Sequence, residues 1–304
     1  MSASTDFRVP PAQRLIQNLL RTLRWPLLVG LLLSAVLLGL TTGRYSLTTG
    51  QILQVLWDAA HGLEDGSVDT LVVLNVRLPR TLLAALTGAG LAICGVALQT
   101  LFRNPLVSPK VLGLSSGSAL GGTLAILAGL SGPLLMGATF LSAFCALFLV
   151  VPIANVAGRT LVAIVLAGIV IDALFAAGVS LVQYAADPES SLPAIVFWLM
   201  GSFASASWDK LQQVAPVLLV SIFLLHRMRF RIAVLAMGDD EARSFGIRVG
   251  QSRIVVFLLI SLVIGACVTA SGVVGWVGLV IPHMARLLVG EDQMRLYPST
   301  VLLG

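Results

Sequence analysis

Three residues in this sequence have types and an order that could support nucleophilic catalysis. The segment Gly113-Leu-Ser115-Ser-Gly117 fits the G-x-S-x-G pattern of a nucleophile elbow, and Asp172 and His283 follow it in the chain order of the α/β-hydrolases. That elbow requires a strand, a sharp turn and a helix, whereas here the motif opens an apolar, helix-like run. An intramembrane hydrolase is therefore a remote alternative.

Metal, redox and nucleotide chemistry have little support in the sequence. Cys94, Cys145 and Cys267 each lie inside an apolar run without CxxC spacing, so neither a disulfide framework nor a metal site is indicated. His283 has no second ligand at a suitable spacing, and we expect no metal and no cofactor. The GxxxxGK[ST] phosphate loop is absent. Energy for any active process must therefore come from a partner or an ion gradient.

The elements that position these residues are apolar helices. The 304-residue chain is 57% hydrophobic and 11% charged, with a mean hydropathy of +0.97, which is too apolar for a soluble domain of this length. A hydrocarbon core about 30 Å thick requires roughly 20 apolar residues per helix. Uncharged stretches of about that length predict eight complete spans, at residues 25–43, 81–101, 111–130, 134–152, 160–182, 211–226, 254–272 and 274–290. A further apolar run begins at 301–303, which suggests a C-terminal truncation.

The charge distribution indicates a membrane topology rather than a nucleic-acid surface. The net charge is +5, but the basic residues fall between apolar runs instead of forming one stripe. Residues 1–24 contain four arginines, and no cleavage site follows the first apolar run, so we expect a cytoplasmic N-terminal segment and a retained first span. This orientation also places the basic segment 226–253 in the cytoplasm, as the positive-inside rule requires.

Several short motifs resemble one transporter family when they are taken together and in order. They are Arg77-Leu-Pro-Arg80, a Gly/Ala-rich span ending at Gln99, Arg103-Asn-Pro-Leu106, Leu112-Gly113-Leu-Ser-Ser-Gly117, Phe197-Trp-Leu-Met-Gly-Ser202, Gly238-Asp-Asp-Glu-Ala-Arg-Ser-Phe-Gly246 and the run from Gly275 to Arg286. From about residue 35 onwards, the chain resembles the permeases of vitamin B12, haem and iron-siderophore ABC importers (FecCD type). The resemblance implies an all-α integral membrane protein, with residues 1–304 as a single transmembrane permease domain in a multi-span helical bundle.

The resemblance also implies a function and partners. The chain would be the permease subunit of a binding-protein-dependent ABC importer in the cell inner membrane, without enzymatic activity of its own. Its partners would be cytoplasmic ATPase subunits, a periplasmic or lipid-anchored binding protein, membrane lipid and a second permease subunit, identical or different, but no nucleic acid. An iron-siderophore is the predicted substrate, and vitamin B12 and haem remain open because the apolar and small residues of the spans are generic.

Two groups of residues acquire partner-binding roles through the resemblance. Within the segment 226–253, a short helix-compatible stretch from Asp239 to Phe245 would be a coupling helix that seats in the ATPase, with Gly238, Glu241, Ala242 and Gly246 matching the motif. Arg77 and Arg80 lie on the expected outer side, against the positive-inside bias, with Pro79 limiting backward extension of the helix. They would form salt bridges to the binding protein, or else snorkel to lipid headgroups.

Two further positions could belong to the transport pathway. Pro105 lacks a backbone N–H, so the chain must turn at Asn104-Pro105-Leu106, either as an ordinary helix end or, as the resemblance implies, as a cytoplasmic gate formed by Asn104 and Leu106. Asp172 lies near the middle of its span, where an unpaired charge costs about 2.5 to 3.5 kcal/mol. It should face protein or water. It is also the thin support for a gradient-driven transporter, the other alternative.

Overall fold

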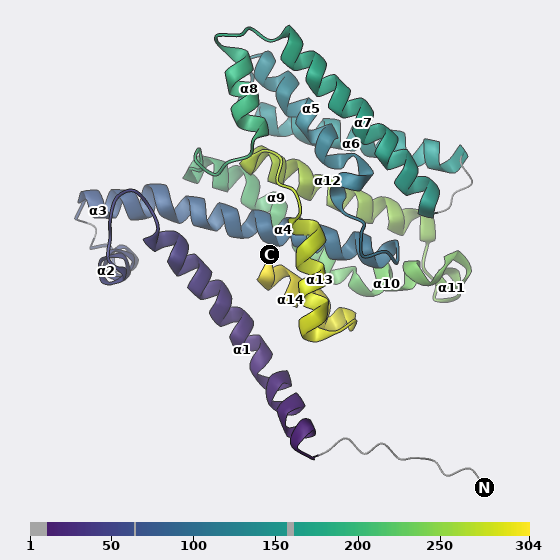
Figure 1. Ribbon diagram of the computed structural model, residues 1–304, viewed down its shortest axis with the longest axis horizontal. Helices are drawn as coiled ribbons and strands as arrows, with labels where there is room; N and C mark the ends of the chain where they lie inside the picture. Colours follow the sequence, from purple (N-terminus) through teal and green to yellow (C-terminus); the bar gives the residue numbers. More distant parts are fainter. Residues whose placement is uncertain (1–10, 64, 157–160) are drawn as a thin grey trace.

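The computed structural model describes residues 11–63, 65–156 and 161–304, and every regular element in those ranges is a helix (Figure 1). Residues 1–10 of the expected N-terminal segment lie outside the described residues. The α-helices are α1 (Pro11–Thr41), α2 (Thr49–Ala60), α3 (Val68–Leu71), α4 (Leu78–Leu101), α5 (Leu114–Leu127), α6 (Gly132–Val156), α7 (Leu161–Ala185), α8 (Ser191–Leu199), α9 (Trp208–Arg227), α10 (Arg229–Met237), α11 (Asp239–Ser244), α12 (Val249–Ser271), α13 (Val277–Val289) and α14 (Gln293–Leu303).

Six helical segments of the described chain are long and apolar enough to cross a membrane. They lie at Arg24–Thr41, Val68–Leu101, Gly132–Val150, Val162–Ala185, Trp208–Arg227 and Val249–Ser271. The prediction of a multi-span helical membrane bundle is confirmed, with six long spans and two shorter apolar helices, Leu114–Leu127 and Val277–Val289, in place of eight spans of full length.

The other two expected spans are shorter helices, because the uncharged runs contain chain breaks. In the run 111–130, α5 is preceded by a 3-10 turn at Pro109–Leu112 and then by Gly113, which has φ +71°. The 14 residues of α5 rise only about 21 Å. In the run 274–290, α13 starts only at Val277 and stops before Gly290, which has φ +78°.

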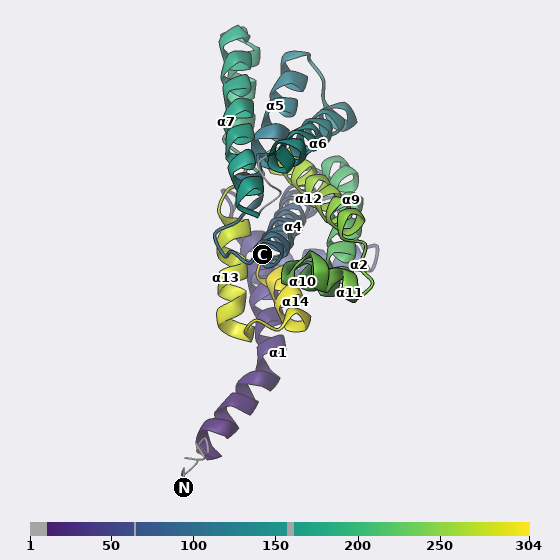
Figure 2. The same cartoon turned by 90° about the vertical axis from the view of Figure 1, so that its right-hand side faces the viewer.

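The centre of the bundle is built on α4 and α12. Within an 18-residue apolar stretch of each span, 67% of the residues are buried in Val68–Leu101 and 78% in Val249–Ser271, against 28% in each of α6, α7 and α9 and 11% in α1. Figures 1 and 2 show α5, α6 and α7 grouped on one side of these central helices, while α1 extends away from the body. The small residues of α4 and α12 therefore serve close helix packing, which replaces the hydrophobic effect inside a membrane.

The close approach of α4 to α13 depends on a glycine. A Cβ added at Gly95 would lie 1.9 Å from the carbonyl oxygen of Gly278 and 2.6 Å from its carbonyl carbon. Both atoms belong to the backbone of α13, so no side-chain rotation can relieve the overlap. The two helices can remain in contact only if residue 95 has no side chain.

Gly95→Val should therefore destabilise the bundle. Overpacking of this kind costs about 1 to 3 kcal/mol, and we expect a thermal midpoint several degrees lower in detergent. Gly30→Val is the matched control, because a Cβ at Gly30 of α1 has nothing within 4 Å. Equal midpoints for the two variants would show that α4 and α13 do not require this contact.

The helical segment that leads into the central helix α4 begins earlier than the sequence predicts. Pro79 was expected to limit how far the helix extends backwards, but α3, a π-helix η1 (Val72–Arg77) and α4 form one continuous segment. Pro79 lacks the N–H for an α-helical bond, and just before it the Leu78 N–H donates to Val73 O, five residues back. The Leu74 carbonyl accepts a hydrogen bond of 2.9 Å from the indole of Trp208 in α9. The wider π-turn thus lets the helix pass the proline.

Candidate functional site

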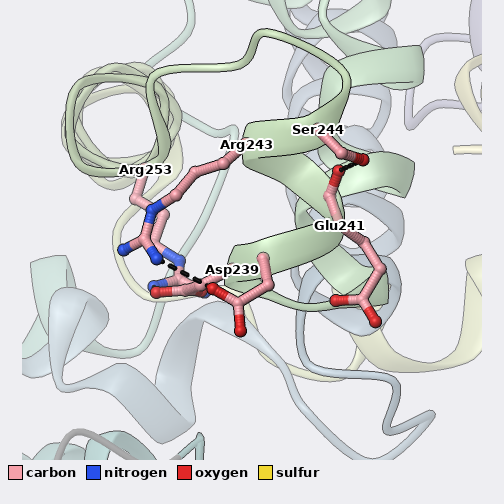
Figure 3. A network of polar contacts seen from close by, with 6 residues as sticks. Asp239, Glu241, Arg243, Ser244 and Arg253 are labelled. Carbon is pink, nitrogen blue, oxygen red and sulfur yellow. Dashed lines mark hydrogen bonds and ion pairs between the residues drawn. The ribbon is translucent and has the colours of Figure 1, made fainter.

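The expected coupling helix is α11, which follows α10 across Gly238. Gly238 has φ +139°, and α11 carries three acidic residues in its first turn. One of them, Asp239, forms an ion pair of 2.7 Å with Arg253 of α12 (Figure 3). A carboxylate near a helix N-terminus is favourable in itself, and this pair also fixes α11 to the most buried span of the bundle.

Gly246 ends α11 through its backbone. The Gly246 N–H donates to Arg243 O at 2.9 Å and the Ile247 N–H to Ala242 O at 3.0 Å, which is the Schellman pattern of a helix C-terminus. Gly246 has φ +74°, a conformation that favours glycine, while a Cβ there would meet nothing within 4 Å. Among the described residues, Gly246 therefore serves to end the helix, and no other residue fills the space beside it.

The remaining coupling candidates divide between the interior and the surface. Ala242 is fully buried and belongs to the main hydrophobic core, so it anchors α11 and offers no surface to a partner. Glu241 is exposed, and so is Phe245, with 59% of its surface accessible. Phe245 borders a groove of about 510 Å³ that also contains Phe230 and Arg248. From the sequence, Phe245 was identified only as the end of the helix-compatible stretch from Asp239. An exposed aromatic side chain in so polar a segment was the available signal.

Arg77 does not fit the docking role predicted for it. Its side chain is buried, with 6% exposure, and its guanidinium donates to the carbonyls of Leu40, Thr41 and Tyr45. These three acceptors leave no free face for a carboxylate of another protein, and the group does not snorkel to lipid either. Arg77 therefore ties the end of α1 to the start of α4, as a structural residue.

Around Arg77, polar side chains close the connection from α1 to α4. Tyr45 donates to Asp69 at 2.7 Å, and this hydrogen bond raises the pKa of the Tyr45 phenol. Asp65 accepts from the backbone N–H of Ser67 at 3.0 Å and the hydroxyl of Thr70 at 2.8 Å, and these bonds lower the pKa of its carboxyl. Because Gln51 of α2 also donates to Asp69, at 3.3 Å, the network joins α2 and α3 to the loop after α1.

Arg80, by contrast, is exposed and only loosely held. Its guanidinium donates one hydrogen bond of 3.2 Å to the carbonyl of Ala204, in the loop between α8 and α9. Lys210 reaches the same loop through a 2.8 Å bond to Ser205. Of the two arginines in the motif, only Arg80 is available to a partner.

The gate candidates lie in the turn after α4. The helix ends at Leu101, four residues before Pro105, because Arg103 adopts φ +48° and the Asn104 N–H bonds back to Gln99 O at 3.1 Å. The Asn104 side chain accepts from the Leu106 N–H at 2.9 Å, and Leu106 is 73% exposed. Asn104 thus shapes the turn that presents Leu106 to the surroundings.

A polar pair missed by sequence reasoning holds α13 to the end of α4. Gln99 is buried, with its amide oxygen accepting from Arg286 and its amide nitrogen donating to Leu279 O at 3.2 Å. Both residues lie in the motifs quoted above, but 187 positions separate them, and no local pattern indicates their contact.

Asp172 is satisfied by a neighbour. It lies half-buried in α7 and accepts a hydrogen bond from the Ser116 hydroxyl at the start of α5. A polar partner offsets the cost of a carboxyl inside a membrane span, which leaves little support for a gradient-driven transporter.

The hydrolase alternative is excluded by the arrangement of its residues. Asp172 bonds Ser116 rather than Ser115, Ser115 is buried, and His283 is exposed on α13. No strand precedes the motif in the described range 65–156. In the described ranges, three or more His, Cys, Asp or Glu side chains nowhere gather as they would around a metal ion.

Comparison with known proteins decides the family. The model of the FecCD transport family matches residues 31–304. The chain belongs to the FecCD transport family. It is accordingly the membrane-spanning permease subunit of an ABC importer, a class that works with ATPase and binding-protein partners and is not itself an enzyme.

Individual relatives of this FecCD permease have different named substrates. It is 45% identical to the molybdate import permease MolB of Haemophilus influenzae, over 90% of this chain and 82% of MolB. It is 36% identical to the hemin permease HmuU of Yersinia pestis, over 76% of this chain and 71% of HmuU. A solved inward-facing ABC transporter described as of the metal-chelate type has a TM-score of 0.78 and 39% identity, covering 90% of this chain and 84% of that one.

Proposed function

We propose that this permease imports a compact metal oxyanion of the molybdate class. The observation that carries the proposal is the 45% identity to MolB over 90% of the chain, against 36% to the hemin permease over 76%. An iron-siderophore is the second candidate, supported by the likeness to a metal-chelate type transporter. Vitamin B12 and haem are less favoured members of the same group.

ATP-driven uptake by the complete transporter in proteoliposomes tests the substrate class. We expect molybdate to accumulate when ATPase and binding protein are present, and not when the ATPase carries an inactive phosphate loop. Ferric siderophore, ferric dicitrate and hemin are offered in parallel. Accumulation of one of these in place of molybdate would reject the oxyanion proposal, and a ferric siderophore would establish the second candidate.

The coupling segment 226–253 is proposed to transmit ATPase motion through α11. The ATPase would be contacted by Glu241 and the exposed ring of Phe245. Movement of α11 would pass to α12 through the buried Ala242 and the Asp239–Arg253 ion pair. Coupling through a short helix is effective only if that helix is rigidly attached, and these two contacts supply the attachment.

The proposal also includes a transport pathway and a second permease subunit. Two permease subunits, identical or different, would enclose the pathway, and Asn104 and Leu106 would line its cytoplasmic mouth. The positive-inside rule supports a cytoplasmic N-terminal segment 1–24, with 226–253 on the same side in the inner membrane.

Arg80 is proposed to dock the binding protein, and Arg80→Glu should weaken that docking roughly fivefold, the equivalent of about 1 kcal/mol for an exposed ion pair. The loss should be larger at low salt, because exposed charges are screened over about 10 Å at 0.1 M. Arg44→Glu, also exposed, is the control for general surface charge. Affinity measurements over a salt series check both. Equal effects of the two reversals would mean that a diffuse field attracts the binding protein.

A further inference from the structure

A pocket of about 650 Å³ opens at the end of the bundle where α4 stops. Residues from four neighbouring segments line it: the end of α4 and the following turn, α10, α13, and the connection into α14. α13 contacts both α4 and α14, so these walls belong to one packed unit. Asn104, the Gln99–Arg286 pair and part of the coupling segment 226–253 border this space, but none of the roles assigned above places a ligand in it.

The side chains around the pocket favour a negatively charged ligand. Arg103, Arg286 and His283 line it, and Glu291 is the one carboxylate among its lining residues. Gln99, 2% exposed, fixes Arg286 by accepting from its guanidinium, while Glu291 lies 3.8 Å from the Arg286 Nε. The Arg103 backbone N–H donates to Thr100 O, but the side chains of Arg103 and His283 have no hydrogen-bond or ion-pair partner among the described residues. Their donors are therefore free to bind an anion.

The position of the pocket indicates where that anion comes from. The Val68–Leu101 span ends at its wall, so the pocket lies at the level where a membrane-spanning helix leaves the hydrocarbon. His283, Arg286 and Leu287 are spaced three and four residues apart on α13 and so share one face of it. Leu287, in the pocket wall, is 75% exposed, and the adjacent Leu288 is 58% exposed. Cationic donors and exposed apolar side chains thus stand together at the membrane surface.

We propose that this pocket binds the headgroup of an anionic phospholipid. The phosphate would contact Arg103 and Arg286, with His283 beside them, and an acyl chain would follow Leu287 along α13. Basic pockets between spanning helices bind acidic headgroups in this way, and a volume of several hundred Å³ suits a ligand of that size. A free inorganic oxyanion could form the same contacts with the arginines, but it has no apolar group to pack against Leu287.

Native mass spectrometry of the full-length chain in a neutral detergent tests the proposal. The probe is phosphatidylglycerol, compared with phosphatidylcholine of the same acyl chains. We expect one phosphatidylglycerol to be retained in preference to phosphatidylcholine. Arg103→Asn should weaken that retention about fivefold, the contribution of one basic residue near an anionic surface. Asparagine tolerates the φ of +48° at this position, so the turn is preserved. Arg103→Lys should retain the lipid.

Lys110→Asn is the matched control, because Lys110 is an exposed cation seven residues further along the same connection and does not line the pocket. Equal losses in Arg103→Asn and Lys110→Asn, or no preference for phosphatidylglycerol, would overturn the proposal. Displacement of the lipid by millimolar inorganic phosphate would instead assign the pocket to a free anion. Binding to the purified chain involves neither ATPase nor transport, so failure here leaves the proposed import function standing, and failure of import leaves this site standing.

Discussion

Arg77→Met should greatly reduce the amount of folded protein, although Arg77 belongs to a motif whose expected role is at the surface. Methionine matches the length of the arginine stem but leaves the carbonyls of Leu40, Thr41 and Tyr45 without their donor. Leaving a buried polar group unpaired costs about 1 to 3 kcal/mol, so a loss on the order of 3 kcal/mol is expected. The measurement is thermal unfolding in detergent, together with the yield of membrane-inserted protein.

Two variants separate this structural role from docking. Arg77→Lys should rescue the protein only in part, because one ammonium cannot reproduce a planar fork that reaches carbonyls both at the end of α1 and in the loop after it. Arg80→Met removes an exposed arginine three residues away and should leave the unfolding midpoint unchanged. If Arg77→Met unfolds like the wild type and yet binds its binding protein poorly, Arg77 acts in docking after all.

Gly246→Trp should abolish most transport while the ATPase remains active. The position is exposed and open, so a large side chain there meets nothing inside this subunit and would project into whatever seats against α11. Overpacking an interface costs about 1 to 3 kcal/mol, which corresponds to roughly fivefold to 150-fold in assembly or rate. Uptake and ATP hydrolysis, measured on the same proteoliposomes, give the ratio that reports coupling.

The φ of +74° at Gly246 makes a second variant necessary. Any L-residue there is strained by about 1 kcal/mol, so Gly246→Ala reports the backbone cost alone, and the difference between Trp and Ala reports the bulk. We expect Gly246→Ala to retain most coupled transport. Similar losses in both variants would show that the end of α11, rather than a partner surface, is sensitive. Normal uptake by the tryptophan variant would make the segment a plain connection.

The helical membrane architecture was predictable because a lipid-spanning chain must satisfy every backbone group within helices. Uncharged runs therefore located six long spans. They overestimated the helix length at 111–130 and 274–290, because hydrophobicity indicates which medium a segment prefers but not where its helix starts. Gly113 precedes the start of α5 and Gly290 follows the end of α13, both with positive φ, although the surrounding runs are apolar throughout.

The sequence indicated which segments form the candidate site, but not which side chains in them are exposed. The α11 stretch and the turn after α4 lie where the motifs indicated. Which residue of a motif faces outwards depends on contacts with distant chain: Arg77 is enclosed by residues more than 30 positions away, and Ala242 by the main core. The Gln99–Arg286 pair has the same character, because a contact across 187 positions leaves no local periodicity.

The π-turn at Val72–Arg77 also restricts how the chain length of this helix can vary. A π-turn accommodates one residue more than an α-turn, so everything before it is rotated by about 100° relative to a continuous α-helix. Substitutions within the turn keep this rotation. Loss of a single residue would instead rotate Asp69 away from Tyr45, while Arg77 and the rest of α4 would stay in place. Length, rather than residue identity, is therefore what natural variation in this segment has to keep.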